Sequence, residues 1–224
     1  MIDRILYFYG MKSLKAILIS NRNYFICYVF FFTVGLIFLL SVGKATSFIE
    51  LNPFHRSVLD TFFVDVTFLG DGRFAIIICL IYLLLRRWSC ACQLIAAFLI
   101  SALVAQILKN IFSMPRPKQF FPAGQYSYFI DGVTHIGFAS FPSGHSTSVF
   151  AMATLLAIFD GNKRGNILYL LVAVAVGYSR IYLGQHFLVD VLVGSVIGVA
   201  TAMLIHLFFL SKWPFRRAAT AAKF

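Results

Sequence analysis

The stretch 24-YFICYVFFFTVGLIFLLSVG-43 holds twenty consecutive residues without a charged side chain. A helix needs about 20 apolar residues to cross the hydrocarbon core of a bilayer, so this stretch predicts a membrane-spanning helix. The whole chain has the same character, because 60% of its 224 residues are hydrophobic and only 12% are charged. A soluble domain carries roughly 25% charged residues. We therefore expect the bilayer to be the solvent, and we treat residues 1–224 as a single domain.

Five further apolar runs follow the first one. They lie near residues 72–85, 92–112, 145–159, 166–182 and 188–211. With the first run they predict an all-α fold, a bundle of six transmembrane helices. The segment 58–70 is apolar enough to form another helix lying against this bundle. Residues 1–23 mix basic and apolar side chains, which is typical of an amphipathic helix on a membrane surface, and residues 212–224 form a basic tail.

The basic residues predict the orientation of the bundle. Twelve of the 19 Lys and Arg residues lie on one side, in the N-terminal segment, the C-terminal tail and the pairs 86–87 and 163–164. Six of the eight acidic residues lie on the other side. Loops rich in Lys and Arg stay in the cytoplasm, so both termini are expected there and loops 44–73, 113–142 and 183–187 face outward.

The same distribution bears on the partners of the chain. The net charge of +11 comes from short basic clusters between apolar runs, which argues against a nucleic-acid partner and for the cytoplasmic loops of a membrane protein. The pattern fits a bacterial inner membrane, with the outer loops in the periplasm. A eukaryotic endomembrane with a lumenal site satisfies the same rule.

Three polar segments interrupt the apolar pattern, each at the outer end of a predicted span. They are 109-KNIFSMPRP-117, 142-PSGH-145 and 179-SRIYLGQHFLVD-190. Packing of the spans is expected to bring them together at the outer face. Lys109, Arg116 and Arg180 would then converge without matching acids, and such a group needs an anion. Phosphate fits, because Arg offers paired donors to its oxygens and Lys offers a point charge.

The remaining polar residues of these segments suggest covalent phosphoryl transfer. Ser143 and Gly144 precede a predicted helix, and the amides at a helix N-terminus favour an anion. His186 and Asp190 are four residues apart, which on a helix places them on one face. A carboxylate bonded to one imidazole nitrogen fixes the tautomer and leaves the other nitrogen free to attack. His145, from another span, is placed to protonate a leaving oxygen.

The spacing of these residues resembles that of a known family. The patterns K-x6-R-P at 109–117, P-S-G-H at 142–145 and S-R-x5-H-x3-D at 179–190 are similar to the three motifs of the type 2 phosphatidic acid phosphatases, relatives of the vanadium haloperoxidases. All three are complete and in order. They span residues 109–190, and the six-span layout extends the resemblance to most of the chain.

The resemblance implies a role for each motif residue. His186 would be the nucleophile that forms a phosphohistidine, Asp190 would orient it, and His145 would be the general acid for the leaving alcohol. The phosphate would be held by Lys109, Arg116, Ser143, Gly144 and Arg180. Members of this family use no metal or other cofactor for phosphatase action, so none is expected here.

The function that follows is a lipid phosphatase acting at the outer leaflet. Its loop 113–142 resembles those of bacterial members from envelope-rich organisms, which favours lipid A as substrate. Undecaprenyl diphosphate, phosphatidylglycerophosphate and phosphatidic acid stay as alternatives. A lipid phosphotransferase would use the same site, and a vanadate-dependent peroxidase or an anion or lipid transporter fits the pattern less well.

Other reactive residues have simpler interpretations. His206 is expected to pack within the last span or to snorkel toward the membrane surface, and His55 and His135 are expected to be exposed loop residues. Cys90 and Cys92 lack the two further ligands that a zinc site needs. The aromatic residues of the outer loop are expected to anchor the protein at the membrane interface, with contact to acyl chains or sugar as the alternative: Phe120, Phe121, Tyr126, Tyr128 and Phe129.

Overall fold

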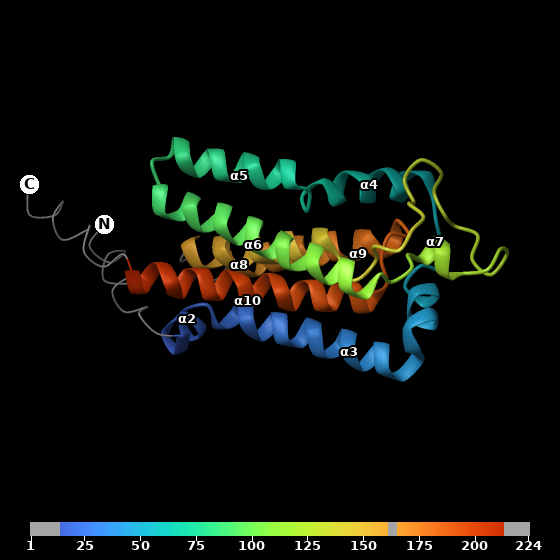
Figure 1. The fold of residues 1–224 in the computed structure, drawn as a ribbon. Coiled ribbons are helices and arrows are strands. Elements are labelled where there is room, and N and C mark those ends of the chain that lie inside the picture. The colour runs from blue at the N-terminus through green and yellow to red at the C-terminus, as the bar shows by residue number, and fades with distance from the viewer. Residues whose placement is uncertain (1–13, 161–164, 213–224) are drawn as a thin grey trace, which may run out of the picture.

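Residues 14–160 and 165–212 are described by a computed structural model, and every regular element within them is a helix (Figure 1). The expected all-α class is therefore confirmed. The elements are α2 (Leu14–Ser20), α3 (Arg22–Glu50), α4 (Ser57–Phe68), α5 (Gly72–Leu84), α6 (Trp88–Phe112), α7 (Pro117–Phe120), α8 (Gly144–Asp160), α9 (Asn166–Tyr182) and α10 (Leu188–Lys212). The basic pair 163–164, the tail after residue 212 and most of the predicted amphipathic N-terminus lie outside the described residues.

The long helices run side by side, and the two ends of the bundle differ (Figure 1). The start of α3 and the end of α10 lie at one end. The short helix α7 and the long loop around it lie at the other end, where α6, α9 and the connection between α9 and α10 also meet. The three polar segments picked out in the sequence therefore gather at one end of the bundle.

The apolar helices agree with the predicted spans in place but not all in length. Three stretches are long and apolar enough to cross a membrane alone, namely Arg22–Glu50, Trp88–Phe120 and Leu188–Ser211. Helices α4 and α5 form a fourth if they count as one span, because they meet at a bend of 49°. Helices α8 and α9 have 17 residues each, short of the usual length. The six-span layout therefore stays a prediction.

Two of the expected helices meet at this bend. The expected helix near 72–85 corresponds to α5, and the expected surface helix at 58–70 corresponds to α4. The break has one local and one long-range cause. Asp71 caps α5 by accepting a hydrogen bond from the backbone N of Arg73 at 2.8 Å. Gly70 lies so close to α9 that an added Cβ would sit 2.6 Å from Cγ1 of Val176.

Helix α8 forms the centre of the bundle. From Ser146 to Phe159, every residue except Leu156 is buried, although the helix carries Ser and Thr as well as apolar side chains. A helix that is buried all round needs neighbours on every side. In this chain α6, α9 and α10 supply them.

Small residues let the neighbours of α8 approach closely. A Cβ on Gly194 of α10 would lie 2.8 Å from the carbonyl O of Ser143, and one on Gly198 would lie 2.8 Å from the backbone N of Ala151. Contacts of this kind are the usual way in which helices pack inside membranes, where small residues bring backbones together. They fix the depth of the start of α8 relative to α10.

A glycine also redirects the end of α3. Gly43 has φ +81° inside the helix, a conformation that residues with a Cβ seldom adopt. The last turns of α3 then bring the buried ring of Phe48 to 5.5 Å from that of Phe187. Phe187 follows the predicted nucleophile, so this kink closes one side of the candidate site.

The contact between α10 and α8 gives a first prediction. Replacing Gly198→Val inserts a branched side chain where the α8 backbone leaves no room, and overpacking of this kind costs about 1–3 kcal/mol. We expect a lower thermal unfolding midpoint in detergent, measured by circular dichroism.

Ala200→Val is the matched control, because Ala200 lies on the same helix and is exposed. Equal midpoints for the two variants would contradict the close contact between the helices.

Candidate active site

The predicted site residues come from five elements and meet at the end of the bundle that carries α7. Lys109 lies in the last turn of α6, and Arg116 is the N-cap of α7. Arg180 lies in the last turn of α9. The charge of Lys109 interacts with those of Arg116, Arg180 and Asp190, so the three cations lie within electrostatic reach of one another.

Each of the three cations is held by a neutral acceptor. Nζ of Lys109 donates to the carbonyl O of Ala139 at 2.6 Å. Nη1 of Arg116 donates to Oε1 of Gln185 at 2.5 Å, and Nη1 of Arg180 donates to Oγ1 of Thr67 at 2.6 Å. Neither Gln185 nor Thr67 was among the candidate site residues. No pattern in the sequence indicated that they would contact the cations.

The cations keep unused hydrogen-bonding capacity. Among residues 14–160 and 165–212, no carboxylate lies within ion-pair distance of any of the three. Nε of Arg180 is buried and has no hydrogen-bond partner in the described part of the chain. A buried guanidinium without a counter-charge is costly. An anion bound beside the three cations would remove that cost. This is the anion that the sequence analysis predicted.

His186 and Asp190 form a buried pair, but they do not share a helix face as the sequence reasoning assumed. His186 precedes α10, and Asp190 lies in its first turn. Nδ1 of His186 is 3.5 Å from Oδ2 of Asp190, within ion-pair distance but outside hydrogen-bond geometry. The carboxylate also accepts from the backbone N of Phe187 at 3.0 Å. This contact to the start of the helix is half of a capping box, and it brings the pair together.

A third residue supports this carboxylate. Oγ of Ser140 donates to Oδ2 of Asp190 at 2.5 Å, and Ser140 is fully buried. The backbone N of Ser143 donates to the carbonyl O of Asp190 at 3.0 Å. The sequence analysis did not identify Ser140 as a site residue. Its only indication in the sequence is that it lies two residues before the P-S-G-H motif.

The P-S-G-H segment begins α8. The buried hydroxyl of Ser143 accepts hydrogen bonds from the backbone N and the Oγ of Ser146, at 3.3 Å and 2.9 Å. It therefore serves as an N-cap as well as a candidate phosphate contact. A Cβ on Gly144 would meet no atom within 4 Å. Close packing with protein therefore does not explain this glycine, and its backbone is open to a ligand.

His145 completes the group from the α8 side. Its charge interacts with those of Arg180, His186 and Asp71. The break between α4 and α5 lies directly against it, since a Cβ on Gly70 would lie 3.2 Å from Cβ of His145. The sequence gave no reason to connect Gly70 or Asp71 with the site.

Burial controls the protonation of His186. The side chain is almost completely buried, and burial lowers the pKa of His186 to about 4, although the Asp190 carboxylate acts in the opposite direction. An ordinary histidine has a pKa near 6.5. His186 is therefore neutral at pH 7, and a neutral imidazole has a nitrogen lone pair available for attack.

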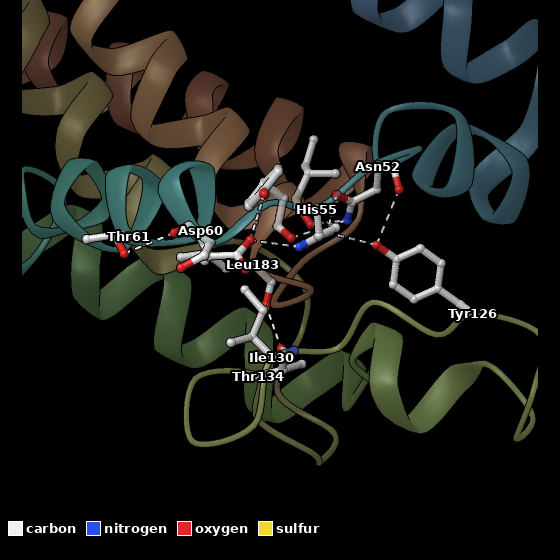
Figure 2. A network of polar contacts seen from close by, with 11 residues as sticks. Asn52, His55, Asp60, Thr61, Tyr126, Ile130, Thr134 and Leu183 are labelled. Atoms are coloured by element: carbon white, nitrogen blue, oxygen red, sulfur yellow. Dashed lines mark hydrogen bonds and ion pairs between the residues drawn. The ribbon is translucent and has the colours of Figure 1, made fainter.

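His55 is not the exposed loop residue that the sequence suggested. Its ring is buried and stacks at 4.2 Å on the ring of Tyr182. Its Nδ1 lies 3.1 Å from Oδ1 of Asp60, and its Nε2 lies 3.0 Å from Oδ1 of Asn52 and 3.2 Å from the Tyr126 hydroxyl (Figure 2). This network joins the α3–α4 connection, the loop after α7 and the end of α9. His55 is buried because its contacts come from segments that lie far apart in the sequence.

The other histidines and the cysteines have different surroundings. His135 is exposed, and His206 packs within the bundle with Nδ1 2.8 Å from Oε1 of Gln93. Packing was one of the two interpretations of His206. None of the four cysteines forms a disulfide, and no group of three metal-ligating side chains occurs among the described residues.

The predicted interfacial aromatics divide into packed and exposed residues. Phe121 is buried and stacks near Phe48 and Tyr126. Phe120 and Tyr128 are more than one-third exposed. Lys44 places its ammonium over the rings of Phe187 and Phe120, 4.1 and 5.2 Å from their centres.

Comparison with known proteins supports the family inferred from the motifs. A family model described as the PAP2 superfamily matches residues 90–214. The chain therefore belongs to this superfamily, the type 2 phosphatidic acid phosphatases. It is 33% identical over 109 residues to a lipid A 1-phosphatase of Rhizobium johnstonii, a match covering 49% of this chain and 43% of that protein. The chain thus spans less than half the length of that relative.

Two further similarities cover more of the molecule. A lipid A 4'-phosphatase of Porphyromonas gingivalis is 28% identical over 175 residues, 74% of each chain. The crystal structure of Aquifex aeolicus LpxE superposes with a TM-score of 0.65 at 27% identity, covering 73% of this chain and 94% of that one. The helical arrangement is therefore similar to that of the solved LpxE structure.

The low pKa of His186 predicts how stability depends on pH. Between pH 6.5 and about 4 the unfolded chain protonates at this residue while the folded chain does not, so the free energy of unfolding falls as the pH drops. The contribution is at most about 1.4 kcal/mol per pH unit. We expect the thermal midpoint to fall less between pH 7 and pH 4.5 in His186→Gln than in the wild type. An identical fall in both proteins would contradict the neutral, buried state of His186.

Proposed function

We propose that this chain removes a phosphate group from a membrane lipid at the outer face of the membrane, through a phosphohistidine formed on His186. The observation that carries the proposal is the combination of a buried neutral imidazole, faced by Asp190, with three cations that have no carboxylate within ion-pair distance among the described residues. These are a nucleophile and an anion site, the two requirements of covalent phosphoryl transfer. Family membership supports the same reaction.

In the first step the phosphate of the lipid is bound by the cations. Lys109, Arg116 and Arg180 contact its oxygens, with Ser143 and the amide of Gly144 at the start of α8. Nε2 of His186 attacks phosphorus, a P–N bond forms, and the bond from phosphorus to the lipid oxygen breaks. His145, whose protonated form the bound phosphate would stabilise, donates a proton to that oxygen. A phosphate monoester then leaves as a neutral alcohol, and a lipid diphosphate leaves as the lipid monophosphate.

In the second step a water molecule attacks the phosphohistidine. His145, now unprotonated, takes a proton from the water, the P–N bond breaks, and inorganic phosphate is released. Asp190 faces Nδ1 throughout and stabilises the positive charge that develops on His186. Ser140 and the N–H of Phe187 hold the carboxylate in this position. No metal or other cofactor enters either step.

For the substrate, lipid A is the preferred candidate. Two of the similar proteins described above are lipid A phosphatases, and the outer loop resembles those of family members from envelope-rich bacteria. Undecaprenyl diphosphate, phosphatidylglycerophosphate and phosphatidic acid also carry a terminal phosphoryl group and stay as alternatives. The concentration of Lys and Arg in the loops predicted to be cytoplasmic supports a site that faces the periplasm across a bacterial inner membrane.

The proposal predicts a specific loss of turnover. His186→Ala removes the nucleophile and should reduce the release of inorganic phosphate from these four lipids to less than about a hundredth of the wild-type rate. His135→Ala is the matched control, because it removes an exposed histidine from the outer loop, and it should keep the wild-type rate.

Two further measurements complete this experiment. EDTA should leave the rate unchanged, and a metal requirement would overturn the mechanism. Consumption of the lipid without release of phosphate would identify a phosphotransferase instead. A His186→Ala protein that is folded and retains more than about a hundredth of the activity would exclude His186 as the nucleophile.

A further inference from the structure

An apolar hollow lies between α5, α8 and α9, beside the break that separates α4 from α5. Its cavity volume is about 270 Å³, close to the lower end of the range for small-molecule sites. Phe74 and Ile78 line it from α5, Met152 and Leu156 from α8, and Val172 from α9. These walls suit a hydrocarbon and offer little to a polar ligand.

One end of the hollow adjoins the candidate active site. Gly70 and Asp71 line the hollow, and Gly70 packs against His145. The charge of Asp71 interacts with those of His145 and Arg180. Ser148 lines the same end, one turn after His145 on α8. The hollow therefore begins where the candidate general acid lies.

From this end the hollow runs along α8, away from the phosphate-binding residues. It extends from Ser148 to Leu156, and eight residues of helix correspond to about 12 Å. Its far end reaches Leu168, which is 63% exposed at the start of α9. The surrounding helix faces carry exposed apolar residues such as Leu171 and Ile77, so the hollow opens sideways to the bilayer.

We propose that this hollow binds one hydrocarbon chain of the substrate lipid, with the phosphate of the same molecule held at Lys109, Arg116 and Arg180. The inference rests on the proposed function. A lipid whose phosphate lies at this end of the bundle directs its chains toward the middle of the bilayer, which is the direction of the hollow. A partner helix, about 10–12 Å across, is too wide for this space.

Binding of a chain here would position the phosphate for attack. A chain held against α8 fixes the distance between the lipid oxygen and His145, which begins the same helix. Small displacements of a reacting group can change rates about 100-fold. The hollow would therefore favour substrates with a long chain near the phosphate over water-soluble phosphate esters.

Filling the hollow tests this role. Val172→Trp and Ile78→Trp each place an indole in the lining, on two different helices. Leu171→Trp and Ile77→Trp are the matched controls, because these neighbouring residues are exposed on the same two helices. Each protein is assayed in mixed micelles on a long-chain lipid phosphate and on p-nitrophenyl phosphate, which has no chain.

We expect both lining variants to lower kcat/KM for the lipid by about tenfold or more, while their rate on p-nitrophenyl phosphate and both control variants stay within about twofold of the wild type. A loss shared equally by lining and control variants, or by both substrates, would overturn the proposal. If the wild-type protein released phosphate from neither substrate, the proposed function itself would fail.

Photo-crosslinking tests occupancy without any need for turnover. The probe is a lipid phosphate with a diazirine in one acyl chain, added to the wild-type protein on ice. Mass spectrometry should find the adducts on residues such as Met152 and Val172, and excess unlabelled lipid phosphate should remove them. Removal by an equal amount of phosphate-free diacylglycerol would mean a structural lipid, and adducts elsewhere would mean no chain site; either result would overturn the proposal.

Discussion

The contact between the start of α8 and the start of α10 is the constraint on which the candidate site depends. The backbone N of Ser143 donates to the carbonyl O of Asp190, and Gly194 lets the two backbones meet at Ser143. His145 follows on one helix and His186 precedes the other, so this one contact sets where the two imidazoles lie. The carboxylate of Asp190 strengthens this contact, because it accepts hydrogen bonds from Oγ of Ser140 and from the backbone N of Phe187 at the start of α10.

The site is also defined by a charge that the protein does not balance. Lys109, Arg116 and Arg180 are each held by a neutral oxygen, and none of them has a carboxylate within ion-pair distance in the described ranges. Asp190 and Asp71 interact with these cations from beyond ion-pair distance, and Asp190 also faces His186. An anion would lower the cost of burying the cations, and the proposed phosphate would supply it beside a neutral imidazole.

Local patterns in the sequence predicted the helices and the motif residues, because apolar runs and motif spacing are local properties. The break at Gly70 was missed, since it depends on the distance to Val176 in a helix a hundred residues away. His55 was misjudged for the same reason, because its partners Asp60, Tyr126 and Tyr182 come from three segments. No spacing rule assigns a role to Ser140, Thr67 or Gln185, so their contacts with the site residues are seen only in the packed structure.

The central claim is that phosphate passes through a covalent bond to His186. The most direct measurement is rapid quenching of the wild-type protein during turnover of a radiolabelled lipid phosphate, followed by mass spectrometry of the labelled peptide. The account predicts an acid-labile, alkali-stable phosphoryl group on the His186 imidazole, formed and lost at rates that match turnover. Label on another residue, or full turnover with no labelled protein at any time, would contradict it.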